Sequence, residues 1–358
     1  MSVGGLYFAV QAPTVFATYV HQLDPVLFQI TEGIALRWYG LAYLVGFLVG
    51  YLLLKRLAER KLWVLAPEKT ADFIAALALL GVFLGGRLGY VLFYQIPRDG
   101  LGSILSDPLV ILRVWEGGMA SHGGILGVAI FTFYYAWRHK LSWTGLGDGI
   151  SVVAPIGLMC GRIANFINGE LYGRVANGVA WAVKFPDAFI NPKLPESGRF
   201  DEAMTAAIHA DDKFLETLSN LPGDSGLNGN EAYYFHQLAE ANRESDAVTD
   251  AIAPYLEPRH PSQLYEALLE GALLFAILWF VRVKFPKAPH GLLTGLFFGL
   301  YATFRIFAEQ FREPDADWVI KDLLTRGQFL SLFMYLFSAA FLIYAFRNRR
   351  ESVTQNAG

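Results

Sequence analysis

Seven long apolar stretches constrain the fold of this chain more than any other feature of its sequence. About 20 mostly apolar residues cross the hydrocarbon core of a bilayer as a helix, because an α-helix rises about 1.5 Å per residue. Unpaired backbone groups cannot face lipid, so open-ended spans must be helical. We therefore predict an all-α polytopic membrane protein with seven transmembrane helices. The stretches are residues 36–54, 72–96, 119–137, 145–167, 262–283, 290–311 and 328–346.

The composition agrees with a membrane protein. Hydrophobic residues make up 54% of the 358 residues and charged residues only 17%, which is too apolar for an ordinary soluble domain. The net charge of -3 gives no sign of a nucleic-acid partner. A single cysteine, Cys160, excludes an internal disulfide framework and a multi-thiolate metal site.

Basic residues in the loops predict the orientation of the spans. Lysine and arginine concentrate on the cytoplasmic side of membrane proteins. The clusters KRLAERK, RHK, RVKFPK and RNRR all lie on one side if the N-terminus is outside the cytoplasm and the C-terminus inside. The sequence therefore predicts this topology.

An acidic stretch separates the fourth and fifth spans. Residues 187–257 contain 14 Asp or Glu and 4 Lys or Arg, and the stretch is broken by NPKLPESG and LPGDSGLNGN. We predict a small helical insertion outside the cytoplasm, although acidic loops of this kind are commonly only solvated surface. The predicted parts are 1–174 with four spans, 175–257 as an insertion or cap, and 258–358 with three spans.

Polar residues of the spans gather at one predicted depth. A charged side chain inside a span costs about 2.5–3.5 kcal/mol and usually faces the protein interior or a wet cavity. The predicted topology places all of these polar residues near the outer leaflet. One binding or active site would produce this arrangement, whereas unrelated structural polar residues would lie at different depths. Arginines in that layer suit a phosphate, and access through lipid suggests a phospholipid headgroup. The residues are Tyr39, Arg87, His122, Arg162, Asn165, Asn168, Glu170, Arg259, His260, Tyr265 and Arg305.

The stretch WEGGMASHGGILG holds His122 between glycines. An imidazole ordinarily titrates near pH 6.5, so His122 could accept a proton, but it could equally be a hydrogen-bonded structural residue. The glycines could serve close helix packing or unwound backbone beside a ligand. Zinc-ligand spacing and a GXSXG elbow are both missing from the sequence, so we predict no metal site and a nucleophile that arrives with the substrate.

Two other functional classes remain open at this point. A transporter of phospholipids or anions would also place arginines in a membrane cavity, but its polar residues should lie at the midplane or on both sides. A membrane-embedded hydrolase would differ only in the acceptor, with His122 activating water.

Six motifs, in order along the chain, closely resemble bacterial prolipoprotein diacylglyceryl transferases: LRWYGLAYLVGF, GVFLGGRLGYVLFY, RVWEGGMASHGGILG, GRIANFINGELYGR, RHPSQLYEALLEG and FREPD. The resemblance implies an enzyme of the bacterial cytoplasmic membrane with its active site toward the periplasm. Such enzymes transfer the sn-1,2-diacylglyceryl group of phosphatidylglycerol to the lipobox cysteine of a preprolipoprotein signal peptide. A thioether forms and glycerol phosphate is released, which is the first step of lipoprotein maturation. No cofactor is implied.

The resemblance also implies residue roles. Arg162 and Arg259 would hold the lipid phosphate, and His122 would be the general base, with a tyrosine as the open alternative. Cys160 would be a helix-packing residue. Four residues match functionally sensitive positions, Tyr39, Asn165, Glu170 and Gly173, and the further site candidates are Tyr265, Glu266 and Arg87. We assign Tyr39 and Tyr265 to the catalytic centre and the others to the binding of phosphatidylglycerol.

Overall fold

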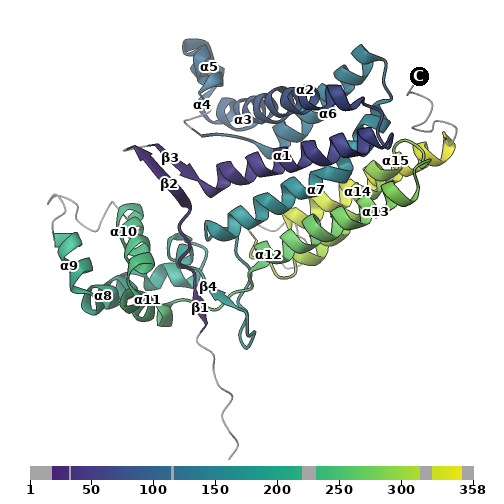
Figure 1. The fold of residues 1–358 in the computed structure, drawn as a ribbon. Helices are drawn as coiled ribbons and strands as arrows, with labels where there is room; N and C mark the ends of the chain where they lie inside the picture. Colours follow the sequence, from purple (N-terminus) through teal and green to yellow (C-terminus); the bar gives the residue numbers. More distant parts are fainter. Residues whose placement is uncertain (1–17, 32–33, 114–116, 220–230, 315–324, 349–358) are drawn as a thin grey trace, which may run out of the picture. The chain divides into compact units, whose positions relative to one another are not determined.

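The computed structural model describes residues 18–31, 34–113, 117–219, 231–314 and 325–348 of the chain. Two compact units are present, which we call the larger and the smaller unit. The larger unit comprises residues 25–171 and 262–358, and the smaller unit residues 1–24 and 172–261. Most described residues are helical, as predicted, and four short strands that were not predicted accompany them (Figure 1).

The larger unit begins with a β-hairpin that leads directly into a helix. In this hairpin Phe28 pairs with Leu36 across the two antiparallel strands. The elements of the unit are β2 (Val26–Thr31), β3 (Ile34–Arg37), α1 (Trp38–Glu59), η1 (Pro67–Lys69), α2 (Thr70–Ala76), η2 (Leu77–Leu84), α3 (Gly85–Tyr90), η3 (Val91–Gln95), α4 (Ile96–Asp99), α5 (Leu101–Ser106), η4 (Pro108–Leu112), α6 (Ser121–His139), α7 (Trp143–Ile167), α12 (Ser262–Glu266), η9 (Ala267–Leu273), α13 (Leu274–Lys284), α14 (Leu292–Ala308) and α15 (Arg326–Arg347).

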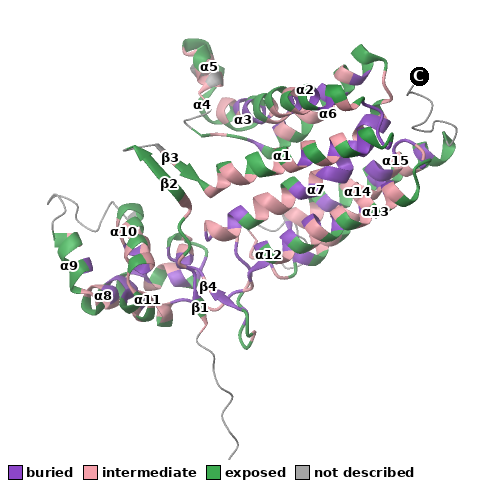
Figure 2. Cartoon of the chain, in the orientation of Figure 1, coloured by how far each residue is buried: buried purple, intermediate pink, exposed green. Residues whose placement is uncertain are grey.

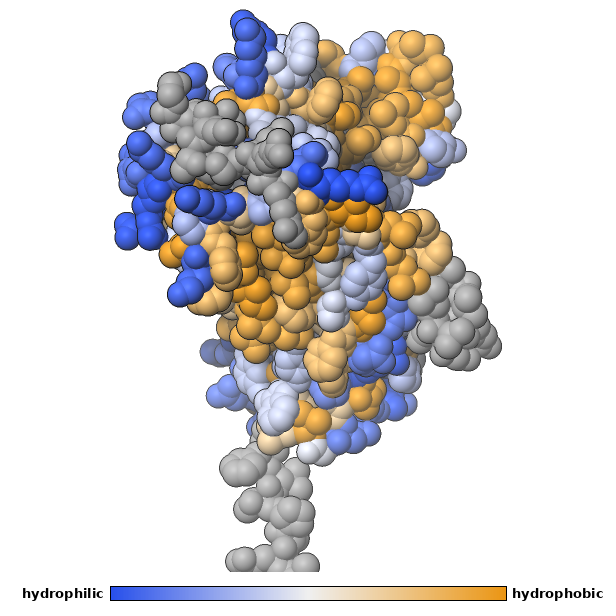
Figure 3. All heavy atoms as spheres, turned by 90° about the vertical axis from the view of Figure 1, so that its right-hand side faces the viewer, coloured by the Kyte–Doolittle hydropathy of each residue, from blue (hydrophilic) through white to orange (hydrophobic). Residues whose placement is uncertain are grey.

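Five helices in the described part of the chain are long and apolar enough to cross a membrane: Trp38–Glu59, Pro67–Asp99, Trp143–Ile167, Ser262–Lys284 and Gly327–Arg347. The predicted span at 290–311 forms α14, which is apolar but only 17 residues long. The predicted span at 119–137 forms the 19-residue α6, whose two histidines and arginine lower its hydropathy. Broad apolar areas lie on the surface drawn in Figure 3. A polytopic helical membrane protein is therefore supported, while the count of seven and the orientation remain predictions.

Helix α7 is the central element of the larger unit. It is the most buried of the candidate spans and packs against α1, α13 and α14 (Figure 2). Ser142 caps its N-terminus by accepting a hydrogen bond from the Gly145 amide at 3.1 Å, which satisfies one of the orphan donors of the first turn. The leucine-rich core gathers around this helix and includes Leu54, Leu146 and Leu274. Side chains near the end of α7 are consequently held by neighbours on several sides.

Glycines allow α3 and α6 to approach each other closely. Gly85 and Gly89 on α3 face Gly123 and Gly127 on α6, each pair separated by four residues. A methyl group on Gly123 would overlap the carbonyl oxygen of Gly85 and lie 2.6 Å from the Cα atom of Gly89. Small residues at this spacing are typical of close helix pairs in membranes. Helix packing therefore accounts for these glycines of the glycine-rich motifs.

A carboxylate from α7 caps the start of α14. Asp148 is buried and accepts hydrogen bonds from the amides of Gly291 and Thr294, both at 2.8 Å, and from the Thr294 hydroxyl at 2.9 Å. The first amides of a helix have no partner within the helix, so a carboxylate from a neighbour stabilises them. This contact fixes the start of α14, whose other end carries Arg305.

The smaller unit contains the acidic stretch, and its described part combines several short helices with two short strands. Strand β1 pairs in parallel with β4, so residues near the N-terminus join this unit. The predicted boundaries at 174 and 257 remain predictions. The elements are β1 (Tyr19–Val20), β4 (Val183–Lys184), η6 (Pro186–Ile190), η7 (Pro195–Arg199), α8 (Phe200–Ala210), α9 (Asp212–Ser219), α10 (Glu231–Glu244), α11 (Asp246–Ile252) and η8 (Ala253–Tyr255).

Candidate active site

The end of α7 and the start of α1 bring three predicted site residues together. The Asn165 side-chain amide donates hydrogen bonds to the Tyr39 hydroxyl at 3.1 Å and to Glu170 Oε1 at 2.7 Å. Glu170 is positioned from both sides, because its amide bonds to the Asn165 carbonyl and its own carbonyl accepts a bond from Gln263 at 2.6 Å. Tyr39, Asn165 and Glu170 thus form one hydrogen-bonded chain.

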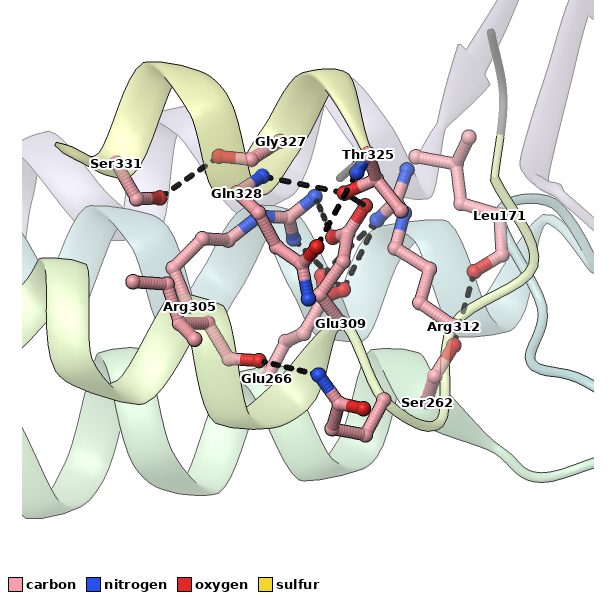
Figure 4. A network of polar contacts seen from close by, with 12 residues as sticks. Leu171, Ser262, Glu266, Arg305, Glu309, Arg312, Thr325, Gly327, Gln328 and Ser331 are labelled. Carbon is pink, nitrogen blue, oxygen red and sulfur yellow. Dashed lines mark hydrogen bonds and ion pairs between the residues drawn. The ribbon is translucent and has the colours of Figure 1, made fainter. Parts of the chain in front are cut away.

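Arg162 lies one turn before Asn165 on α7 and joins a buried carboxylate. Its Nε atom is 2.8 Å from Glu266 Oε2. Glu266 also accepts hydrogen bonds from Arg305 at 2.9 Å and from Arg312 at 3.0 Å. Figure 4 shows Arg305 and Arg312 converging on Glu266. The Glu266 side chain is fully buried, so it acts as the hub of three guanidinium groups from separate segments.

Two further glutamates complete this group. Arg305 Nη2 is 2.8 Å from Glu309 Oε2, and Thr325 at the start of α15 donates a hydrogen bond to Glu309 Oε1 at 2.9 Å. Glu270 lies 3.5 Å from Arg162 and 3.6 Å from Arg305. We call these six residues the arginine–glutamate cluster: Arg162, Arg305, Arg312, Glu266, Glu270 and Glu309. Its three positive and three negative groups balance, as buried charges require.

The arginines of the cluster differ in their exposure. The side chains of Arg162 and Arg305 are 18% and 13% exposed, whereas that of Arg312 is 4% exposed. The bonds to glutamate orient the first two guanidinium groups, and each of these two side chains remains partly exposed. A planar guanidinium held in this way is suited to bind an oxyanion through paired N–H donors.

Arg259 lies in the smaller unit, where its guanidinium contacts residues of the same unit. Its guanidinium donates hydrogen bonds to Glu196 Oε1 at 2.9 and 2.7 Å and to the Gly173 carbonyl at 3.3 Å. The Tyr172 ring lies beneath it, with the centroid 5.3 Å from the guanidinium carbon. Burial raises the pKa of Tyr172 to about 12, so the phenol is neutral and Glu196 supplies the balancing charge. The Arg259 residue is 1% exposed, so these contacts hold its guanidinium in place, and its role in phosphate binding remains a prediction.

We expect Glu196→Ala to lower the free energy of unfolding by about 3–5 kcal/mol, because it leaves a buried guanidinium without its counter-charge. Thermal unfolding of the purified protein measures the effect. The control is Glu202→Ala on the exposed face of α8. An unchanged melting temperature for Glu196→Ala would mean that Arg259 does not depend on this pair.

Arg87 holds a loop by binding backbone carbonyls. Its guanidinium donates hydrogen bonds to the carbonyls of Val110, Ile111, Gly117 and Gly118. The residue is 3% exposed, and its guanidinium lies over the Tyr90 ring. Its donors are directed at the segment that precedes α6, so a contact with phosphatidylglycerol remains a prediction without support from this geometry.

His122 and Tyr265 stand at the starts of two helices. His122 is exposed in the first turn of α6 and forms no hydrogen bond or ion pair with another described residue. The adjacent Gly123 fixes this turn against α3. Tyr265 is half-buried on α12, where its ring packs edge-to-face on Phe311. The imidazole is accessible, as a general base requires, but no contact connects it with the arginine–glutamate cluster within the described residues.

Sequence reasoning missed Arg312, Glu270, Glu309 and Glu196 as partners of the candidate arginines. Two features of the sequence could have indicated some of these partners. Arg305 and Glu309 are four residues apart on one helix, a spacing that places opposite charges side by side. Arg312 belongs to the FREPD motif, which carried no assigned role. The pairing of Glu196 with Arg259 spans 63 positions and has no local signal.

The chain is similar to known proteins over most of its length. The family model described as prolipoprotein diacylglyceryl transferase matches residues 25–344. A protein of Bdellovibrio bacteriovorus is 39% identical over 324 residues, covering 88% of this chain and 91% of that protein. A protein of Serratia proteamaculans is 37% identical, covering 92% of this chain and 96% of the relative. Both relatives are named phosphatidylglycerol–prolipoprotein diacylglyceryl transferase.

Proposed function

The chain belongs to the prolipoprotein diacylglyceryl transferase family, and on this premise we propose that it transfers the sn-1,2-diacylglyceryl group of phosphatidylglycerol to the lipobox cysteine of prolipoproteins. The observation that carries the proposal is the match across residues 25–344. The arginine–glutamate cluster supports it, because a phospholipid phosphate is the ligand that oriented guanidinium groups at the end of a membrane bundle would bind. The enzyme would carry out the first step of bacterial lipoprotein maturation.

The reaction is a displacement at the sn-3 carbon of the diacylated glycerol, which is the carbon joined to the phosphate oxygen. The cysteine sulfur forms the new C–S bond, the C–O bond to the phosphate breaks, and glycerol phosphate leaves with the bonding electrons. Arg162 and Arg305 would bind the phosphate and stabilise the charge that develops on the leaving group. Arg305 is a further candidate beside Arg259, because it shares Glu266 with Arg162 and its side chain is partly exposed.

The hydrogen-bonded chain of Tyr39, Asn165 and Glu170 would orient the lipid headgroup beside Arg162. Tyr39 comes from α1, Asn165 from the last turn of α7 and Glu170 from the turn after it, so the three residues connect two helices. Glu266 would act through the arginines rather than contact the lipid, because its side chain is fully buried. Gly173 would support the turn that carries Arg259, whose guanidinium bonds to its carbonyl.

The thiol must lose a proton to attack, since a free cysteine ionises near pH 8.5 and is mostly protonated at neutral pH. His122 is the proposed acceptor because its ring is exposed. Tyr39 and Tyr265 remain the alternatives.

We expect His122→Ala to reduce transfer about a hundredfold near pH 7, and the loss should shrink toward about pH 9, where the thiol ionises unaided. The pH profile of kcat/KM measures this. His139→Ala, at the exposed far end of the same helix, is the matched control. A loss of the same size at every pH would argue against a base role and for a structural one.

The cytoplasmic membrane is the proposed location, with the site toward the periplasm. The apolar helices support a multi-pass membrane protein, and the four basic loop clusters support this orientation. The insertion at 175–257 would then form a periplasmic cap that helps to admit the signal peptide.

The test uses purified protein, vesicles of phosphatidylglycerol and a peptide that contains a lipobox cysteine. Mass spectrometry should show addition of a diacylglyceryl group to the peptide and none to a Cys→Ser peptide. Release of diacylglycerol and glycerol phosphate without peptide would instead indicate a hydrolase. Movement of lipid between leaflets without either product would indicate a transporter.

A further inference from the structure

Glu270 differs from the other carboxylates of the arginine–glutamate cluster in how loosely it is held. Its side chain is fully buried, yet its nearest cationic atoms are Arg162 Nη2 at 3.5 Å and Arg305 Nη1 at 3.6 Å. Its Oε2 atom accepts a long hydrogen bond from Arg162 Nη2, and its Oε1 atom accepts none within the described part of the chain. Glu266 and Glu309, in contrast, lie 2.8 to 3.0 Å from their arginines.

The backbone around Glu270 fixes this position. Glu270 lies in η9, a π-helical segment inside the Ser262–Lys284 helix, and such segments occur frequently at functional sites. The next residue, Gly271, packs so closely on α7 that an added methyl group would lie 2.5 Å from the Cβ atom of Met159. The carboxylate therefore faces the Arg162–Arg305 pair from a rigid element.

Glu270 determines the net charge that the arginine pair presents. The cluster is neutral with Glu270 and carries one positive charge without it. The other two glutamates orient the guanidinium groups through short contacts, whereas Glu270 contributes mainly through its electrostatic field. At such distances in a buried site, one charge changes the affinity for an anion considerably.

The substrate and product of the proposed reaction differ in charge. Phosphatidylglycerol is a phosphodiester with one negative charge, whereas glycerol phosphate is a monoester that approaches two, because the second pKa of a phosphate monoester is near 6. Excess positive charge would bind the product more strongly than the substrate. Slow product release would then limit turnover.

We propose that Glu270 is a positioning residue that neutralises the Arg162–Arg305 pair so that it binds a phosphodiester but releases the phosphomonoester product. This inference rests on the proposed function. Glu270 itself stays buried and acts through the two arginines.

The test measures the binding of sn-glycerol 1-phosphate to the full-length protein in phosphatidylcholine nanodiscs, where no transfer takes place. We expect Glu270→Gln to bind this product roughly tenfold more tightly than the wild type. In the transfer assay, KM for phosphatidylglycerol and kcat should both fall. A purely structural defect would lower kcat without tightening the binding of the product.

Matched variants separate charge from folding. Glu270→Asp keeps the charge and should bind the product as the wild type does, while Glu270→Ser is a second neutral variant in case Gln disturbs the packing. Glu59→Gln, exposed in the last turn of α1, controls for the loss of a surface charge. Wild-type affinity for the product in a folded neutral variant would overturn the inference. Absence of transfer by the wild type would overturn the proposed function instead, and the binding assay would still be interpretable.

Discussion

Replacing either Arg162 or Arg305 with lysine should reduce diacylglyceryl transfer about a hundredfold or more, a loss comparable to removing one preorganised donor from an oxyanion site. Lysine keeps the charge but offers a single ammonium in place of the planar fork. In Arg162→Lys the Nε atom that lies 2.8 Å from Glu266 disappears. In Arg305→Lys one ammonium cannot reproduce the separate bonds to Glu266 and Glu309.

Steady-state kinetics on phosphatidylglycerol vesicles, normalised to folded protein, measure this loss. Arg138→Lys, on the exposed end of α6, is the conservative control. Arg259→Lys separates the two assignments of the second phosphate ligand. If Arg259 is structural, its variant should lose thermal stability but retain turnover per folded molecule. If Arg259→Lys loses turnover at an unchanged melting temperature while Arg305→Lys remains active, the assignment of Arg305 is wrong.

The proximity of Tyr39 and Asn165 could be predicted, although their hydrogen bond could not, because the order of the predicted spans gives each residue a predicted depth. Each span has one direction, so a residue at the end of the fourth span and one at the start of the first must share a layer. Tyr39 and Asn165 obey this rule, and the structure joins them by a hydrogen bond. The same reasoning placed Arg162 and Arg305 together, and both now contact Glu266.

Partners of the buried charges could not be predicted in the same way. Arg87 and Arg259 are predicted in the same layer as Arg162, but periodicity and topology describe only depth and not direction around a helix axis. Arg87 turns toward the carbonyls of Val110, Ile111, Gly117 and Gly118. Arg259 finds Glu196, which a sequence reading treats as one of many acidic residues in a solvated insertion.

The sequence also did not determine the lengths of the predicted spans. A window of apolar residues does not show where a helix begins, because capping depends on residues from other elements. Helix α14 starts only at Leu292, where Asp148 of α7 accepts its first amides. Helix α15 starts at a capping box around Thr325, whose hydroxyl also binds Glu309 of the cluster. The helix ends that surround the candidate site are therefore set by long-range polar contacts.

Gly123→Ala should destabilise the protein by about 2–3 kcal/mol or more, the range expected when a methyl group is forced into a close-packed contact. The new Cβ atom would overlap the Gly85 carbonyl oxygen and lie 2.6 Å from the Gly89 Cα atom. Both neighbours are backbone atoms of α3, so no side-chain rotation relieves the overlap. Helices α3 and α6 would have to separate, and His122 in the preceding position would move with them.

Gly124→Ala is the matched control on the same helix. Its added methyl group would have its nearest neighbour, the Val82 carbonyl oxygen, at 3.7 Å, which is ordinary van der Waals contact. Both substitutions gain the same helix propensity of alanine over glycine, about 1 kcal/mol, so the difference between the two melting temperatures isolates the packing contact. A large loss in Gly123→Ala together with an unchanged or higher melting temperature in Gly124→Ala would show that the glycines beside His122 serve helix packing. Equal stability of the two variants would mean that α3 and α6 do not meet closely at Gly123, which would contradict the packing role of this glycine.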